Sequence, residues 1–188
     1  MNVDKRQKIL NTALTLFVEQ GYHATSTASL AKKAGVANGT VFHHFGSKKQ
    51  LINELYLSIK TELADNILPK EEPELLIDQA KLLWNNAINW AIVNPKKHLF
   101  FDTFTHTKVI DATVRQEAMN NILGFICQMI QKGQQQKIIA DFPIELMLEN
   151  CYGQYINAAS YFIEHPEFCQ SEHHRDASFK LFWNAMRL

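Results

Sequence analysis

The side chains best suited to chemistry gather in one short segment of the 188-residue chain, residues 35–51, GVANGTVFHHFGSKKQL. This segment holds two adjacent histidines, two adjacent lysines and three glycines, and it contains no acidic residue. Imidazole and ammonium groups donate hydrogen bonds to anions, and glycine lets the backbone approach a ligand closely. The segment therefore suits the binding of an anionic partner.

Elsewhere the sequence offers little that would catalyse a reaction. It contains no HExxH zinc motif, no nucleophile elbow, no phosphate-binding loop and no pair of carboxylates in a credible setting. Cys127, Cys151 and Cys169 are odd in number and have no CxxC spacing, so a disulfide framework is not expected. We expect a protein that is not an enzyme and that needs no cofactor.

A metal-responsive site is the alternative that the sequence leaves open. The segment HPEFCQSEHH contains His165, Cys169, His173 and His174, and the i, i+4 spacing of Cys169 and His173 can ligate zinc or copper. Pro166 and the acidic neighbours favour a solvated loop instead. We therefore predict no metal site and retain metal sensing as the alternative function.

The charge of the chain is distributed unevenly although its formal sum is zero. Residues 1–60 hold eight Lys/Arg and three Asp/Glu, a net charge of +5, and the remaining residues hold eleven and sixteen, a net charge of −5. A basic end on an acidic body indicates an anionic partner for the first part alone, and chance clustering on a solvated surface is the alternative.

The sequence also indicates where the protein works. The first residues, MNVDKRQKIL, lack the apolar core of a signal peptide. No apolar run approaches the roughly 18 residues needed to span a bilayer. We expect a cytoplasmic protein that has no membrane partner.

The elements that must position the basic segment are helices. Apolar residues recur at helical spacing from Ile9 to Val18, and Gly21 can end this first helix. A second helix has Ser26 or Thr27 as its candidate N-cap, and Gly35 lies just past its end. Two short helices joined by a tight turn are the layout of a helix-turn-helix, with the third helix from about residue 38 to 45.

The rest of the chain is also predicted to be helical, so the fold class is all-α. Ser47 and Gln50 form a capping box that begins a fourth helix, residues 47–68. The proline-bracketed segment LPKEEPELL is the predicted boundary between the two parts of the chain. We expect a DNA-binding domain at residues 1–50, connected through helix 47–68, and a C-terminal domain at residues 51–188. The further predicted helices are 73–93, 95–107, 112–137, 143–165 and 172–187.

A helical wheel of residues 38–45 separates a packing face from an exposed face. Val41 and Phe45 fall together, so they must pack on the second helix. His43 lies opposite, flanked by Gly39 and Thr40. Small groups, a hydroxyl and an imidazole can enter a major groove and meet base edges. Packing alone would explain Val41 and Phe45, but not the exposed glycine and the absence of acids.

The ends of the neighbouring helices would supply phosphate contacts. Lys48 is the first residue of the fourth helix, whose N-terminal amides and positive dipole end favour an anion. Thr25, Ser26 and Thr27 would add hydroxyls at the start of the second helix. Contacts of this kind give affinity and register, while the short third helix reads the base sequence.

Residues 9–56 closely resemble the N-terminal DNA-binding region of the TetR family of bacterial transcriptional regulators. The match has no gap and covers roughly a quarter of the chain. It rests on Phe17, Gly21, Tyr22, Thr25, Thr27, Ala31, Ala34, Gly35, Val36, Gly39, Thr40, Phe42, His44, Phe45 and Lys48. The resemblance implies a homodimer, usually a repressor of a palindromic operator, whose larger C-terminal domain binds a small molecule.

Two positions depart from the family pattern. Ala37 stands where a polar residue usually caps the recognition helix, and Asn38 could replace this cap in part. Phe42 stands where a tyrosine commonly donates its hydroxyl to a phosphate, so its role shrinks to apolar contact. Carried over to this sequence, the DNA-contact positions are Thr27, Ala37, Asn38, Gly39, Thr40, Phe42, His43, His44 and Lys48.

The C-terminal part of the chain is rich in aromatic residues. Any one of them more often belongs to an ordinary core than to a binding site. The resemblance implies a ligand pocket among the middle helices. No charged residue clearly belongs inside it, so we expect a largely apolar effector. The candidate effector-binding residues are Trp84, Phe101, Phe104, Phe125, Gln128, Tyr152 and Tyr155.

The last two helices are predicted to form the dimer interface. Residues 179–186 show an i, i+3, i+4, i+7 apolar pattern that would form one exposed stripe, and helix 143–165 is apolar on several sides. A two-fold contact between subunits would cover both surfaces. The predicted interface residues are Tyr155, Phe162, Phe179, Phe182, Trp183 and Met186.

Overall fold

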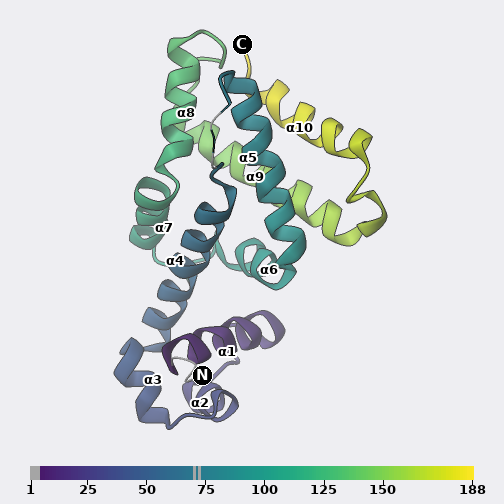
Figure 1. Cartoon of the computed structure of the whole chain (residues 1–188). Coiled ribbons are helices and arrows are strands. Elements are labelled where there is room, and N and C mark those ends of the chain that lie inside the picture. Colours follow the sequence, from purple (N-terminus) through teal and green to yellow (C-terminus); the bar gives the residue numbers. More distant parts are fainter. Residues whose placement is uncertain (1–4, 70, 72) are drawn as a thin grey trace.

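A computed structural model describes residues 5–69, 71 and 73–188 of the chain. These residues form a small N-terminal unit and a larger helical body, and one long helix, α4, runs from the first into the second (Figure 1). The predicted all-α fold class is confirmed. Lys70 and Glu72, within the predicted domain boundary, lie outside the described residues, as do residues 1–4.

The N-terminal unit consists of three helices packed beside the start of α4. They are α1 (Lys5–Gln20), α2 (Thr27–Ala34) and α3 (Asn38–Phe45), and α4 spans Lys48–Ile67. Their contact surfaces are the apolar faces predicted from sequence, and the fully buried side chains include Ile9, Phe17, Leu30 and Leu51.

Glycine permits the tight connection between α2 and α3. Gly35 ends α2 in the left-handed region, with φ of 66°, where a side chain would be strained. The Val36 amide donates to the Ala31 carbonyl at 3.0 Å, so the turn satisfies the end of the helix. The chain then reverses at once into α3.

The larger body is a bundle in which α5 packs against α4 and α9, and α10 packs against both α5 and α9. Among the described residues, no helix is long and apolar enough to cross a membrane. The elements of the body are α5 (Leu76–Val93), α6 (Pro95–Phe104), α7 (Ala112–Glu117), the π-helix η1 (Ala118–Ile122), α8 (Gly124–Gln135), α9 (Ile144–Glu164), the 3-10 helix η2 (Pro166–Phe168) and α10 (Glu172–Met186).

The prediction of one helix over residues 112–137 is wrong, because this segment is interrupted. Residues 118–122 form a π-turn, in which the Leu123 amide donates to the Ala118 carbonyl at 2.9 Å. Leu123 leaves helical geometry, with φ of −105° and ψ of 13°, before α8 begins at Gly124. Hydrophobic periodicity does not reveal this break, since the apolar residues on both sides of it still face the bundle.

Candidate nucleic-acid interface and ligand cavity

The third helix presents the two faces that its sequence predicts. Val41 and Phe45 are only 2% and 3% exposed and pack into the N-terminal core. Asn38, Gly39 and His43 are exposed on the opposite face. A side chain at Gly39 would meet no atom within 4 Å, so nothing within the chain itself requires glycine there. This face is open to a partner.

The remaining predicted contact residues on α3 lie around the same face. Ala37 is exposed, Thr40 and His44 are partly exposed, and the Phe42 side chain is 45% exposed. Ala37 occupies the N-cap position without a side-chain capping hydrogen bond. Asn38 is instead the first residue of the helix, so its amide group remains available to a ligand.

Lys48 has a structural role that its sequence position did not reveal. Its Nζ atom donates to the backbone carbonyls of Tyr22 and Thr25, each at 2.9 Å, and lies 4.3 Å from the centre of the Tyr22 ring. These contacts fasten the α1–α2 connection to α4. An ammonium group has three N–H donors, so one remains for a phosphate.

The start of α2 divides into one buried and two surface residues. Thr25 is fully buried, and its hydroxyl donates to the Gly21 carbonyl at 2.9 Å. The prediction that the Thr25 side chain contacts phosphate is therefore wrong, because its hydroxyl supports the end of α1. Ser26 caps α2 by accepting from the Ser29 amide at 3.0 Å, and Thr27 is partly exposed.

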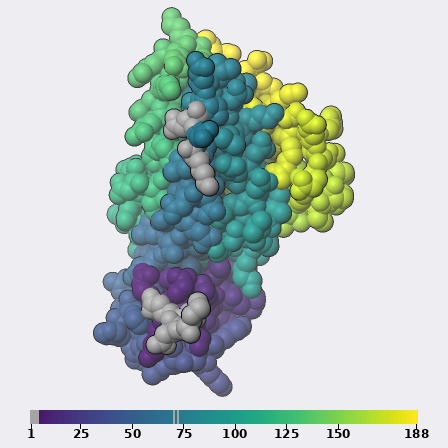
Figure 2. All heavy atoms as spheres, in the orientation of Figure 1, coloured from purple at the N-terminus to yellow at the C-terminus, as the bar shows by residue number. Residues whose placement is uncertain are grey.

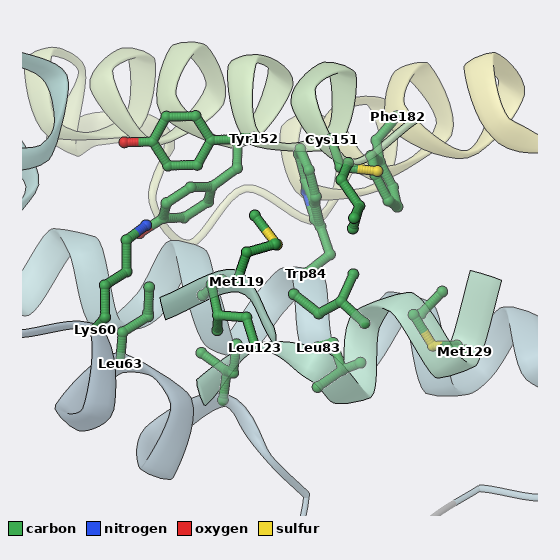
Figure 3. Close-up of a pocket in the computed structure, with 16 residues that line it drawn as sticks. Lys60, Leu63, Leu83, Trp84, Met119, Leu123, Met129, Cys151, Tyr152 and Phe182 are labelled. Carbon is green, nitrogen blue, oxygen red and sulfur yellow. The ribbon is translucent and has the colours of Figure 1, made fainter. Parts of the chain in front are cut away.

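The larger body contains a second candidate site, an apolar cavity between α4, α5, η1, α8, α9 and α10 (Figure 3). The cavity has a volume of about 110 Å³. Leu63, Trp84, Met119, Leu123, Cys151 and Phe182 are among the side chains that line it. Met119 and Leu123 come from the π-turn and the residue after it, so the break in the helix shapes the cavity wall.

Lys60 of α4 is the one charged side chain among the described residues that line this cavity. It is only 2% exposed, and its Nζ atom lies 4.2 Å from the ring centre of Phe101 and 4.5 Å from that of Tyr152. Burial lowers the pKa of Lys60 to about 7, although Glu149 opposes this shift. The prediction that no charged residue lies inside the pocket is thus wrong.

Sequence reasoning missed Lys60 because lysines at helical positions are usually solvated. A signal was nevertheless present, since Lys60 falls one residue after Ile59 and four after Tyr56, on the apolar side of α4. Both of these neighbours are buried.

The predicted effector-binding residues divide into two groups. Trp84, Tyr152 and Tyr155 line the cavity. Phe101 and Phe104 are buried but do not border it. Two others, Phe125 and Gln128 of α8, are also absent from its wall, and Gln128 is exposed to solvent.

The predicted dimer stripe on α10 faces inward. Phe179, Trp183 and Met186 are at most 8% exposed, and Phe182 stacks on Trp84 with ring centres 4.5 Å apart. Tyr155 and Phe162 of α9 are buried as well. The prediction that this stripe is exposed on the surface of the subunit is therefore wrong. The i, i+3, i+4, i+7 pattern marks the side of α10 that packs on α5 and α9.

The histidines and cysteine that suggested a metal site are engaged in other contacts. His174 stacks on Phe168 with ring centres 4.0 Å apart, and the Cys169 thiol donates to the Phe162 carbonyl at 3.2 Å. His165 lies 3.4 Å from Glu167, and His173 is exposed. Within the part of the chain that the structure describes, no three His, Cys, Asp or Glu groups come together as metal ligands.

The sequence and the structure of this chain are similar to those of known bacterial regulators. The model of bacterial regulatory proteins of the tetR family matches residues 9–55. A crystal structure of a putative tetR family transcription regulator from Shewanella sp. PV-4 is 49% identical, with a TM-score of 0.96, and the alignment covers 99% of this chain and 100% of that one. This chain belongs to the tetR family of bacterial transcription regulators.

Two curated relatives match this chain over part of its length. The HTH-type transcriptional repressor KstR2 of Rhodococcus jostii is 39% identical over 51 residues, which are 27% of this chain and 25% of that protein. The HTH-type transcriptional regulator AcrR of Shigella flexneri is 43% identical over 53 residues, 28% of this chain and 25% of that protein. Each of these matches covers only about a quarter of this chain and of the relative, so neither similarity extends over the whole chain.

Proposed function

We propose that this protein is a ligand-responsive repressor. As a homodimer it binds a palindromic DNA operator, and it leaves the operator when a small, largely apolar molecule enters the cavity of the larger body. The observation that carries the proposal is the face of α3, where Asn38, Gly39 and His43 are exposed while Val41 and Phe45 hold the helix from behind.

The face of α3 has the properties that base recognition requires. Helix α3 is eight residues long and lies at the outer edge of the N-terminal unit (Figure 1). The major groove of DNA is wide enough to admit a single α-helix. His43 carries the longest polar side chain at the centre of this face, and Thr40 and Asn38 add hydrogen-bonding groups beside it. The N-termini of α2 and α4 flank this face and supply amides for phosphates.

Repression is favoured over activation because KstR2, one of the similar proteins, is a transcriptional repressor. Physical blocking of a promoter needs DNA binding alone. Activation would require a surface that contacts polymerase, and no feature of the described residues points to one.

The α4 helix would carry the effect of the ligand to the DNA-binding unit. Its first residue, Lys48, holds the α1–α2 connection, and Lys60 of the same helix reaches the cavity. A helix transmits displacement along its axis because its hydrogen bonds make it stiff. We accordingly place the DNA-binding domain at residues 1–50 and the effector-binding and dimerisation domain at residues 51–188.

A groove between α9 and α10 is the surface that we assign to the dimer. Leu181 is 74% exposed and Tyr161 is 39% exposed on its walls, with Ala158 and Ala177 between them. The C-terminal part of the chain, which includes α10, forms one flank of the body (Figure 2). Exposed apolar side chains of this size favour a second copy of the chain as their cover.

Sequencing of DNA fragments captured by the purified protein tests the proposal. We expect a two-fold symmetric site with half-sites about one helical turn apart, roughly 34–36 Å centre to centre. His43→Ala should lose about 1–3 kcal/mol of discrimination at one or two base pairs per half-site and keep its non-specific affinity.

His173→Ala is the matched control, because His173 is an exposed histidine on α10, outside the N-terminal unit. It should leave the base preference unchanged. Capture of random fragments without a shared sequence would refute the proposal. An unchanged base preference of His43→Ala would transfer the reading role to Thr40 or Asn38.

A further inference from the structure

The cavity contains hydrogen-bond donors that have no acceptor. Lys60 is 2% exposed, and the contacts of its Nζ atom among the described residues are with the aromatic rings of Tyr56, Phe101 and Tyr152. The Tyr155 hydroxyl, on a side chain that is 8% exposed, also has no hydrogen-bond partner. A buried donor without an acceptor lowers the stability of the folded state, so the presence of these groups in the cavity needs an explanation.

The aromatic rings beside Lys60 compensate for only part of this cost. The Nζ atom lies over Phe101 and Tyr152 at 4.2 and 4.5 Å, and Tyr56 is 5.5 Å away. The faces of aromatic rings attract a cation but cannot accept a strong hydrogen bond from it. The site therefore tolerates an ammonium group while leaving its N–H bonds unused.

The other side chains on the cavity wall supply no anion. None of the described lining residues is an aspartate, glutamate, asparagine, glutamine or histidine. The Tyr152 hydroxyl donates to Thr105 at 2.7 Å, and the Trp84 indole donates to Ser178 at 3.1 Å, so both polar groups are already used. The cavity thus combines donors without acceptors and a wall of apolar carbon.

An outer cleft adjoins the cavity at Lys60. Its wall includes Arg115, Glu145 and Glu149, and it shares Lys60 and Tyr152 with the cavity. The inner space is apolar and the outer space is polar, so a molecule that entered would align its polar end with Lys60. Glu149 is the nearest competitor, but no ion pair joins it to Lys60, and its carboxylate lies on an exposed residue.

We propose that the effector is an amphiphilic monocarboxylic acid whose carboxylate binds the Lys60 ammonium group and whose apolar tail fills the cavity beside Trp84 and Phe182. A carboxylate is an acceptor-only group, and it would satisfy the free N–H bonds of Lys60 in surroundings where a charge-assisted hydrogen bond is strong. The inference rests on the proposed ligand-responsive function, for which it specifies the chemical class of ligand.

The lowered pKa of Lys60 agrees with this geometry. Because burial lowers the pKa of the amine to about 7, a bound carboxylate would restore its charge, and the ion pair would form where neither charge has another partner. A neutral head group would accept a weaker hydrogen bond from Lys60, and a cationic head group would be repelled by its charge.

Three compounds with the same eight-carbon tail separate the contribution of the head group. Octanoate, 1-octanol and octylammonium are titrated into wild-type protein at pH 7, with tryptophan fluorescence as the readout because Trp84 lines the cavity. We expect octanoate to bind at least tenfold more tightly than 1-octanol, and octylammonium to bind most weakly. Lys60→Met should lose the preference for octanoate and still bind 1-octanol.

Lys132→Met is the matched control, since it removes an exposed lysine of α8 and changes the net charge equally. It should keep the wild-type order of affinities. Equal binding of octanoate and 1-octanol to wild type would overturn the inference while leaving a ligand cavity in place. If none of the three compounds binds, the inference and the ligand-responsive part of the proposed function both fail.

Discussion

Asn53 and Asp111 bind each other through two hydrogen bonds that join α4 to the loop before α7. The Asn53 amide donates to the Asp111 carboxylate at 2.5 Å, and the Asp111 backbone amide donates to the Asn53 side-chain oxygen at 3.2 Å. Lys49 adds an ion pair to the same carboxylate at 2.8 Å. Lys49 and then Asn53 hold the pKa of Asp111 below its ordinary value. Helix α7 follows this loop and leads directly into the π-turn that borders the cavity.

Replacement of Asn53 by alanine should therefore destabilise the protein. The side chain is 8% exposed, so the Asp111 groups would lose buried partners, at a cost of about 1–3 kcal/mol in the free energy of unfolding. Urea unfolding measures the change. Asn66→Ala on the same helix should cost less, because exposed Asn66 bonds only to the Glu62 carbonyl within α4. Equal losses would show that the link to Asp111 contributes nothing.

Lys48→Ala should have two separable effects. Loss of the bonds to the Tyr22 and Thr25 carbonyls should lower the free energy of unfolding by about 1–3 kcal/mol. Loss of one phosphate contact should weaken binding to cognate and unrelated DNA alike and reduce the salt slope by roughly one. Binding titrations at several salt concentrations measure the slope, with Lys132→Ala as the control. A weaker affinity with an unchanged slope would mean that Lys48 acts only by supporting the fold.

Leu181→Glu should convert the proposed homodimer into monomers. A carboxylate on the groove between α9 and α10 would lose its water on association and face its symmetry mate across the two-fold axis. Light scattering at micromolar concentration measures the mass. Leu146→Glu offers a control, because Leu146 of α9 is 65% exposed but does not line this groove. Persistence of the dimer in Leu181→Glu would place the interface elsewhere.

Lys60→Met should stabilise the protein without ligand, and the gain should depend on pH. The folded state lowers the pKa of Lys60 from 10.5 to about 7, so the cost of burying its charge is fully present below pH 7. This cost disappears as the pH rises from 7 towards 10.5, where the unfolded chain also loses the proton. The expected gain is about 1–4 kcal/mol at pH 6, and it should shrink steadily by pH 9.

Unfolding by urea at pH 6, 7.5 and 9 measures this trend. The other titratable or charged groups around Lys60 include the phenols of Tyr56 and Tyr152 and, on the outer cleft that Lys60 also borders, His106, Arg115, Glu145 and Glu149. Burial raises the pKa of Tyr56 to about 12 and raises that of Tyr152 further, so neither phenol titrates in this range. A gain that did not change with pH would contradict the assignment of the buried charge to Lys60.

Local sequence signals predicted the N-terminal unit well. The glycine at position 35 and the capping box at Ser47 act through bonds a few residues long, so they define α2, α3 and the start of α4 without reference to the rest of the chain. The faces of α3 follow from helical periodicity, since Val41 and Phe45 have only one core to join. Lys48 was harder to interpret, because its partners are backbone carbonyls 23 and 26 residues away.

The larger body could be predicted only in outline. The stripe of Phe179, Trp183 and Met186 was correctly apolar, but periodicity does not state whether such a stripe faces its own bundle or a second subunit. The helices α5 to α10 pack against one another and against α4, and which faces become buried depends on packing between segments distant in the sequence. The cavity also depends on packing between distant segments, because its wall combines side chains from α4, α5, η1, α8, α9 and α10.

The π-turn at residues 118–122 makes the shape of the cavity depend on helical register. A π-turn closes its hydrogen bond one residue later than an α-turn, so the segment accommodates one residue more than a regular helix would. A return to α-helical bonding would rotate every later side chain of this segment by about 100° around the axis, and Leu123 would leave the cavity wall. Deletion of a single residue here would therefore reshape the ligand site while every lining residue kept its chemical identity.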